Sequence, residues 1–194
     1  MHFFILLLGL IFSIPAFAVV QTDLRTFGKD APVQLYVFTS LTCPHCAGFH
    51  EKILPALKKE YADTGMAQIT IVNMLTNPNG LTAAQTMRCL RPEIADKLEH
   101  ELYAEQAKWM YQNTKQANKK IAEYASHVGM TQKQFNQCQA NKDLKKMVIE
   151  QQANLARLYG ITATPTLVMR QGTEVHKWSG ASESLLDELK EVLQ

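Results

Sequence analysis

The most constraining feature of the sequence is an apolar run that breaks into a pair of cysteines. Residues 33–39 (VQLYVFT) are rich in β-branched and aromatic side chains, which is typical of a largely buried strand. After a short polar turn comes Cys43-Pro44-His45-Cys46, and apolar residues then recur at helical spacing as far as Tyr61. The sequence therefore predicts a strand, a tight turn carrying two thiols and an amphipathic helix in direct succession.

Two cysteines three positions apart at the start of a helix favour redox chemistry. Unpaired N–H groups and the positive end of the helix dipole converge there, so they stabilise a thiolate at Cys43 and make its sulfur both a nucleophile and a leaving group. His45 can add a positive charge or a donated hydrogen bond to the same sulfur. Pro44 suits the first helical turn because it has no N–H to lose there. We therefore predict a redox-active disulfide between Cys43 and Cys46.

The alternative for such a pair is half of a zinc site. His50 lies four residues after Cys46 and could be a third ligand, with Cys89 or Cys138 as the fourth. A strand and a helix directly flank the pair, however, and this is the context in which a redox motif is expected. We therefore predict no metal at Cys43 and Cys46.

The rest of the chain predicts a mixed α/β protein with a long helical stretch. Residues 67–72 form a second strand, and strand, helix and strand make a βαβ unit with parallel pairing. Residues 76–80 (TNPNG) indicate a loop, after which the pattern is helical as far as Tyr159. The expected elements after this loop are helices over 82–90, 92–112, 115–128, 131–139 and 143–159, a strand over 161–169, a hairpin arm over 173–178 and a last helix after Ser182.

Three stretches together resemble the DsbA-like thiol-disulfide oxidoreductases. They are Ala31-Pro32-Val33 before the first strand, the Cys-Pro-His-Cys motif and residues 54–65 (LPALKKEYADTG). The resemblance runs from about Ala31 to the C-terminus and implies an α/β thioredoxin fold with an inserted all-helical domain. We accordingly expect a thioredoxin-like domain over residues 19–78 and 160–194, and a helical insertion over 79–159.

The first residues predict export. Residues 3–14 form a short apolar block, and residues 13–18 (SIPAFA) end it with a small-x-small pattern typical of a secretory signal cleaved after Ala18. The alternative is an N-terminal membrane anchor, but the block is shorter than the roughly 20 residues that a bilayer span needs. We therefore expect a signal peptide over residues 1–18 and a periplasmic or otherwise exported mature chain.

The resemblance also gives a role to Thr164-Pro165. An X-Pro bond in a folded protein is cis in only about 5–6% of cases, so the residues by themselves favour trans. Thioredoxin-fold oxidoreductases place a cis-proline beside the disulfide, which implies that the Thr164 backbone pairs with an extended substrate peptide against Cys43. The buried acidic residue of DsbA has no counterpart here, since the matching strand position is Val37. This difference implies another proton route at Cys46, through water.

Two further cysteines lie in separate predicted helices. An active Cys43–Cys46 pair leaves Cys89 to pair with Cys138, and an oxidising compartment would preserve that bond. A subset of DsbA-like proteins shares such a pair, which implies a structural disulfide. The alternative is two buried free thiols, because free cysteine is a common core residue.

The resemblance implies an enzyme that donates the Cys43–Cys46 disulfide to unfolded or reduced, newly exported proteins and needs no other cofactor. A membrane quinone-linked oxidase of the DsbB type would regenerate it. The formal charge of +2 gives no reason to expect a nucleic-acid partner. The nearest alternative is a disulfide reductase or isomerase, although exported isomerases of this fold carry an N-terminal dimerisation domain that does not fit between Ala18 and Pro32. A metal-binding or chaperone module is the alternative from another class.

Overall fold

The computed structural model describes residues 24–180, 182 and 184–193. The predicted signal peptide over residues 1–18 lies outside the described residues. Within the described residues, no helix combines the length and the apolar character that a membrane crossing requires.

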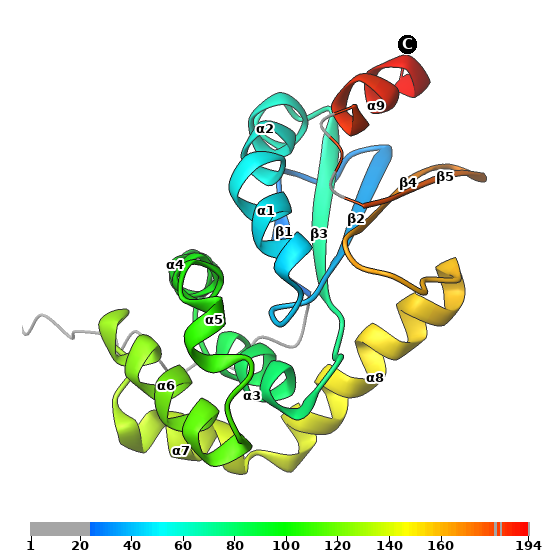
Figure 1. Cartoon of the computed structure of the whole chain (residues 1–194). Helices are drawn as coiled ribbons and strands as arrows, with labels where there is room; N and C mark the ends of the chain where they lie inside the picture. Colours follow the sequence, from blue (N-terminus) through cyan, green and yellow to red (C-terminus); the bar gives the residue numbers. More distant parts are fainter. Residues whose placement is uncertain (1–23, 181, 183, 194) are drawn as a thin grey trace, which may run out of the picture.

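A five-stranded mixed sheet forms the centre of the fold (Figure 1). Strands β2 and β3 are parallel, as the βαβ pattern predicted, whereas β1, β4 and β5 each run antiparallel to their neighbours. The register pairs Val33 with Ala67 and Thr39 with Asn73. In spatial order the strands are β1 (Thr26–Phe27), β3 (Ala67–Asn73), β2 (Val33–Thr39), β4 (Thr166–Gln171) and β5 (Glu174–Ser179).

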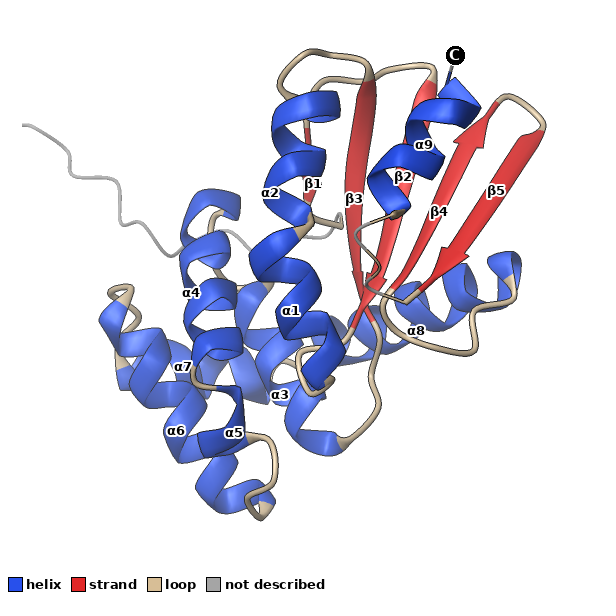
Figure 2. Ribbon diagram, turned by 45° about the horizontal axis from the view of Figure 1, so that its top comes forward, coloured by secondary structure: helices blue, strands red, loops and turns tan. Residues whose placement is uncertain are grey.

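Helices cover both faces of this sheet (Figure 2), which explains why β2 is apolar on both sides. Helix α8 (Lys142–Tyr159) covers one face, where Leu155 and Tyr159 pack on Phe38. The other face packs against α1 (Pro44–Lys52), α2 (Leu54–Leu57), the π-helical segment η1 (Lys58–Ala62) and α9 (Leu185–Leu193). Pro55 sits in the first turn of α2, so the break between α1 and α2 falls where the helix would otherwise lose a backbone hydrogen bond.

A helical layer with its own core lies beside the sheet. Fully buried Leu98, Trp109 and Ile121 lie in this core, and Leu41 and Cys46 from the first βα unit belong to the same cluster. The cysteine motif therefore sits at the junction of the two parts. The layer consists of α3 (Pro78–Met87), α4 (Pro92–Ala104), α5 (Gln106–Trp109), α6 (Thr114–His127) and α7 (Gln132–Ala140).

The helical layer begins earlier than the sequence predicted. Asn77 caps α3, its side chain accepting a hydrogen bond of 2.9 Å from the Gly80 N–H, and Pro78 occupies the first helical turn. The interpretation of residues 76–80 as a loop was therefore wrong from Pro78 onwards. Asparagine followed by proline is a helix start as well as a turn signal, and the chain here uses it as the former.

The predicted continuous helix over 92–112 is also wrong, because it breaks at Glu105 into α4 and α5. In an unbroken helix, the Leu102 carbonyl would accept from the backbone N–H four residues later. Here it accepts a hydrogen bond of 2.8 Å from the indole N–H of Trp109. This side-chain bond stabilises the break and keeps Trp109 fully buried.

Strand β4 begins at Thr166, not at residue 161 as predicted. Its partner β2 pairs Phe38 with Thr166 and ends one residue later, so the preceding segment has no strand to pair with. Pro165 also has no N–H to donate to a ladder. Residues 161–165 therefore form a connection that crosses the end of the sheet beside the cysteine motif.

Candidate active site

The end of β2 and the start of α1 position the two cysteines. Cys43 is the N-cap residue of α1, and Pro44 follows in the first helical turn. The Cys43 N–H donates to the Ser40 carbonyl at 3.0 Å, and the Cys46 N–H donates to the Cys43 carbonyl at 3.0 Å. These bonds fix the turn between strand and helix. Both cysteines are free thiols in this structure.

The two sulfurs lie in different environments. Cys43 is partly exposed at the helix end, whereas the Cys46 side chain is fully buried. Burial raises the pKa of Cys46 to about 11, although hydrogen bonding from the Thr39 side chain and from the Ser40 backbone N–H, 3.3 Å from the sulfur, partly opposes this. Cys43 is therefore the thiol that another molecule can reach, and Cys46 is a protonated, shielded partner.

The connection before β4 contributes the third part of the site. The Thr164–Pro165 peptide bond is cis, and Pro165 is buried. The Cys43 thiol donates a hydrogen bond of 3.4 Å to the Thr164 carbonyl across 121 positions of sequence. The fold thus brings Cys43, Thr164 and Pro165 together, and the Thr164 backbone lies directly against the exposed sulfur.

His45 lies on the exposed side of the first turn of α1. Among the described residues, no hydrogen bond or ion pair joins its ring to either cysteine. Its effect on the Cys43 sulfur therefore stays a prediction.

Gln106 is a site residue that the sequence did not reveal. Its buried side chain, at the start of α5, donates to the Leu41 carbonyl at 2.9 Å and to the Cys43 carbonyl at 3.0 Å. One amide group from the helical layer thus holds both ends of the cysteine turn. Nothing in the local pattern could have singled it out, because its partners lie 65 and 63 positions away.

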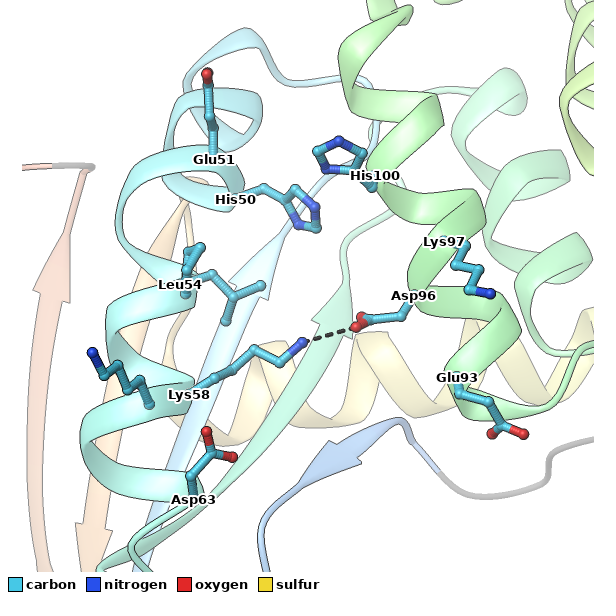
Figure 3. Close-up of a pocket in the computed structure, with 11 residues that line it drawn as sticks. His50, Glu51, Leu54, Lys58, Asp63, Glu93, Asp96, Lys97 and His100 are labelled. Carbon is cyan, nitrogen blue, oxygen red and sulfur yellow. Dashed lines mark hydrogen bonds and ion pairs between the residues drawn. The ribbon is translucent and has the colours of Figure 1, made fainter. Parts of the chain in front are cut away.

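His50 does not point towards a metal site with the cysteines. Its Nδ1 atom lies 3.5 Å from the buried Oε2 atom of Glu99, and its ring packs 4.8 Å from the ring of Tyr103 on α4. Figure 3 shows the His50 ring turned towards α4, with His100 close to it. No cluster of three or more histidine, cysteine or acidic side chains suited to a metal ion occurs in the part of the chain that the structure describes.

The other two cysteines lie in the helical layer. Cys89, just after α3, and Cys138 of α7 are joined by an S–S bond of 2.00 Å, with Cα atoms 6.1 Å apart. Cys138 is buried, and its carbonyl accepts a hydrogen bond of 2.7 Å from the Gln85 side chain. This bond lies inside the core of the helical layer, apart from the sheet.

Comparison with known proteins agrees with this arrangement. A family model described as thioredoxin matches residues 22–190. The chain belongs to the thioredoxin family. A curated Rickettsia conorii relative named "Putative protein-disulfide oxidoreductase" is 26% identical over 180 residues, which cover 90% of this chain and 64% of that protein. The chain thus spans less than two thirds of the length of this relative.

Two solved structures show the same fold as this thioredoxin-family chain. The crystal structure of Wolbachia pipientis α-DsbA1 has a TM-score of 0.77 at 24% identity and covers 90% of this chain and 91% of that one. A protein-disulfide isomerase from Novosphingobium aromaticivorans has a TM-score of 0.76 at 20% identity, with 88% and 97% covered. The predicted class, a DsbA-like thioredoxin fold with a helical insertion, is therefore confirmed.

Proposed function

We propose that this chain is an exported protein-disulfide oxidoreductase that donates the Cys43–Cys46 disulfide to reduced proteins. One observation supports the proposal above all: a reachable sulfur at a helix N-terminus lies 3.4 Å from a backbone carbonyl beside a cis-proline, with a fully buried second sulfur behind it. This arrangement presents one sulfur to a partner and shields the other. The thioredoxin family and the name of the Rickettsia relative support the same chemistry.

The reaction begins when a substrate thiolate attacks the Cys43 sulfur of the oxidised pair. The Cys43–Cys46 bond breaks, a mixed disulfide forms, and Cys46 takes the electron pair and then a proton. A second thiolate of the substrate attacks the first substrate sulfur and releases Cys43. Two electrons thereby pass from the substrate dithiol to the enzyme, and the helix N-terminus stabilises the Cys43 thiolate that leaves.

The Thr164 backbone would orient the substrate. An extended peptide that pairs with the backbone before Pro165 places its own cysteine against Cys43, because the Cys43 sulfur is already within hydrogen-bond distance of the Thr164 carbonyl. The substrate class is unfolded or partly folded exported protein, since recognition through backbone groups needs an extended chain. A membrane quinone-linked oxidase of the DsbB type would return the reduced enzyme to the disulfide form in the periplasm.

Disulfide reduction or isomerisation is the second candidate. The Novosphingobium protein, which shares the fold, is named a protein-disulfide isomerase, and this name favours the second candidate. The two directions differ in how stable the Cys43–Cys46 bond is relative to the disulfides of the substrates. An oxidase needs a disulfide that is less stable than those it makes, and a reductase needs one that is more stable.

The test is an equilibrium titration of the mature protein against glutathione, with the redox state of Cys43 and Cys46 read by thiol alkylation and mass spectrometry. A reduction potential near −120 mV, on the order of that of DsbA, is the expected result. A value near −270 mV, on the order of that of thioredoxin, would reverse the direction in favour of a reductase. A pair that never exchanges with glutathione would end both assignments.

A further inference from the structure

A backbone N–H group faces the buried sulfur of the redox pair. The Ser40 nitrogen lies 3.3 Å from the Cys46 sulfur, and both residues are fully buried. Burial raises the pKa of Cys46 to about 11, and the hydrogen bond from Ser40 opposes this rise because it stabilises the thiolate form. In the proposed reaction, negative charge develops on this sulfur whenever Cys46 leaves or attacks. A donor that is already aimed at the sulfur stabilises both events.

Ser40 lies just beyond the end of the sheet ladder. Strand β2 ends at Thr39, which pairs with Asn73 of β3, and its pairing with β4 ends one residue earlier, at Phe38. The Ser40 carbonyl accepts a hydrogen bond of 3.0 Å from the Cys43 N–H, which closes the turn. The orientation of the Ser40 N–H therefore depends on this turn and on the contacts of the Ser40 side chain.

The Ser40 side chain belongs to a group of three hydroxyls from Ser40, Thr42 and Thr76, here called the hydroxyl cluster. The Ser40 oxygen lies 3.1 Å from the Thr76 oxygen and 3.3 Å from the Thr42 oxygen. The two threonine oxygens are 2.7 Å apart. The Ser40 oxygen also accepts a hydrogen bond of 3.4 Å from the Thr42 N–H. Each hydroxyl thus contacts both of the others, and Ser40 is held through its side chain as well as its carbonyl.

Thr76 reaches this cluster from a distant part of the chain that is held at both ends. It lies between β3 and α3, 34 positions from Thr42. Two residues before it, the Met74 N–H donates to the Thr39 carbonyl at 2.6 Å, and directly after it Asn77 caps α3. The Thr76 hydroxyl is therefore presented to Ser40 from a fixed backbone, although the residue itself is exposed.

Gln106 holds the other side of the same turn. Its side chain donates to the carbonyls of Leu41 and Cys43, so it acts on the residue that carries the partly exposed sulfur. The hydroxyl cluster instead acts on Ser40, whose N–H faces the buried sulfur. The two supports therefore correspond to two different steps of disulfide exchange.

We propose that Thr76 is a positioning residue that holds the Ser40 N–H against the Cys46 sulfur through the hydroxyl cluster. This proposal rests on the proposed function. When a substrate thiolate attacks Cys43, the Cys43–Cys46 bond breaks and the electron pair goes to the Cys46 sulfur. The Ser40 N–H donates to this sulfur until it takes a proton from water. In reoxidation the Cys46 thiolate attacks the Cys43 sulfur of a mixed disulfide, the Cys43–Cys46 bond forms, and the partner sulfur leaves as a thiolate. The Ser40 N–H keeps its own proton throughout.

The test follows reoxidation of the full chain, reduced at Cys43 and Cys46, by glutathione disulfide. In the first step Cys43 attacks glutathione disulfide and forms an adduct, and in the second step Cys46 displaces glutathione and closes the bond. Thr76→Val removes the hydroxyl and keeps the shape of the side chain, whereas Thr76→Ser keeps the hydroxyl. Thr64→Val is the matched control, because Thr64 is also exposed, lies just before β3, and makes two hydrogen bonds to backbone carbonyls of η1.

The proposal predicts that one step slows and the other does not. Thr76→Val should form the glutathione adduct of Cys43 at the wild-type rate but close the Cys43–Cys46 bond about three- to tenfold more slowly, measured by rapid acid quench and intact mass. Removal of a donor costs about 10²–10³-fold, and the loss is smaller here because the Ser40 N–H is still present but less well aimed. Thr76→Ser and Thr64→Val should close the bond at the wild-type rate. Ser40→Ala, which removes the centre of the cluster, should slow closure at least as much as Thr76→Val.

The outcomes separate this proposal from the function on which it rests. If Thr76→Val closes the bond at the wild-type rate, or slows adduct formation and closure equally, Thr76 does not position a donor for Cys46; the proposal is then wrong, while disulfide exchange stands. If the wild-type protein forms neither the adduct nor the Cys43–Cys46 bond, the proposed function is wrong and this proposal falls with it. If Ser40→Ala does not fold because Ser40 is fully buried, the variants of the exposed Thr76 decide.

Discussion

The two cysteine pairs of this molecule differ in their surroundings, and this difference favours disulfide exchange at one pair and a structural bond at the other. Cys43 and Cys46 lie at the start of a helix, free in this structure, with one sulfur partly exposed. Cys89, just after α3, and Cys138 of α7 are bonded to each other. Disulfide exchange requires a thiolate that can reach another sulfur. The helix N-terminus and the accessibility of Cys43 therefore favour redox activity at Cys43 and Cys46, whereas the presence of two cysteines alone does not.

The pairs also differ in what they connect. Cys43 and Cys46 lie within one turn of helix, and a bond between them closes a very short loop. The bond between Cys89 and Cys138 closes a loop over 49 positions and ties α3 to α7. Each pair nevertheless has a buried glutamine that donates to the backbone carbonyl of one of its cysteines: Gln106 for Cys43 and Gln85 for Cys138. This common feature allows the two regions to be compared by matched substitutions.

The largest expected effect is the loss of exchange in Cys43→Ser. Because the partly exposed Cys43 sulfur is the proposed nucleophile, the rate of exchange with glutathione should fall by more than about 10³-fold, although Cys89 and Cys138 are still present. Cys46→Ser should instead keep the first step and trap Cys43 in a mixed disulfide. Thiol alkylation and intact mass measure both. Residual exchange in Cys43→Ser would mean that the second pair is also redox active.

The second effect concerns stability. Cys89→Ser with Cys138→Ser should lower the free energy of unfolding by about 4 kcal/mol, because the loop over 49 positions no longer restrains the unfolded chain. Exchange at Cys43 should be unchanged. Urea unfolding of the oxidised proteins measures the loss, and reduction of the Cys43–Cys46 bond alone should cost less, since its loop is short. An equal cost for the two bonds would break the distinction between a structural and an exchangeable pair.

The third effect belongs to the reduced form of the Cys43–Cys46 pair. The folded-state pKa of Cys46 is about 11, against 9.0 for the ordinary thiol, so the unfolded chain loses this proton first as the pH rises. The stability linked to Cys46 is therefore intact below about pH 9 and is lost as the pH rises through about 11, by roughly 2–3 kcal/mol at most. Urea unfolding of reduced wild type and reduced Cys46→Ser measures it as a difference. A difference that does not change with pH would show that Cys46 is not shielded.

The parts of this fold that the sequence predicted are those with local signals. One contiguous stretch predicts the strand over 33–39, the turn at Cys43 and the parallel pairing with β3. In that stretch, neighbouring residues carry the signals for a buried strand, a turn and a helix start. The errors lie where a distant contact decides the outcome. The break at Glu105 depends on where the Trp109 side chain packs, and the start of β4 depends on where β2 ends.

The candidate site divides in the same way. Cys43 and Cys46 could be read from their spacing, and Pro165 from family resemblance. Gln106 and the Tyr103 hydroxyl could not, since each is a polar group on a helix whose partners lie far away in sequence, among residues 39–43. A helical pattern identifies Tyr103 as a packing residue, which its buried ring also is, but it says nothing about the hydroxyl that meets Thr39.

The smallest expected effect compares the two glutamines. Gln106→Met and Gln85→Met have matched volumes and each leaves two backbone carbonyls without a side-chain donor, so each should cost about 1–2 kcal/mol of unfolding free energy. The cost for Gln106 is moderated because the Cys43 carbonyl still accepts from the Cys46 N–H. Their effects on exchange should differ: Gln106→Met loosens the turn that presents Cys43 and should slow exchange by up to about tenfold, since positioning errors slow reactions. Gln85→Met should leave the rate unchanged, because its carbonyl partners, those of Cys138 and Asn141, belong to the helical layer and not to the cysteine turn. Equal rates in the two variants would mean that Gln106 supports the fold without positioning the reactive sulfur.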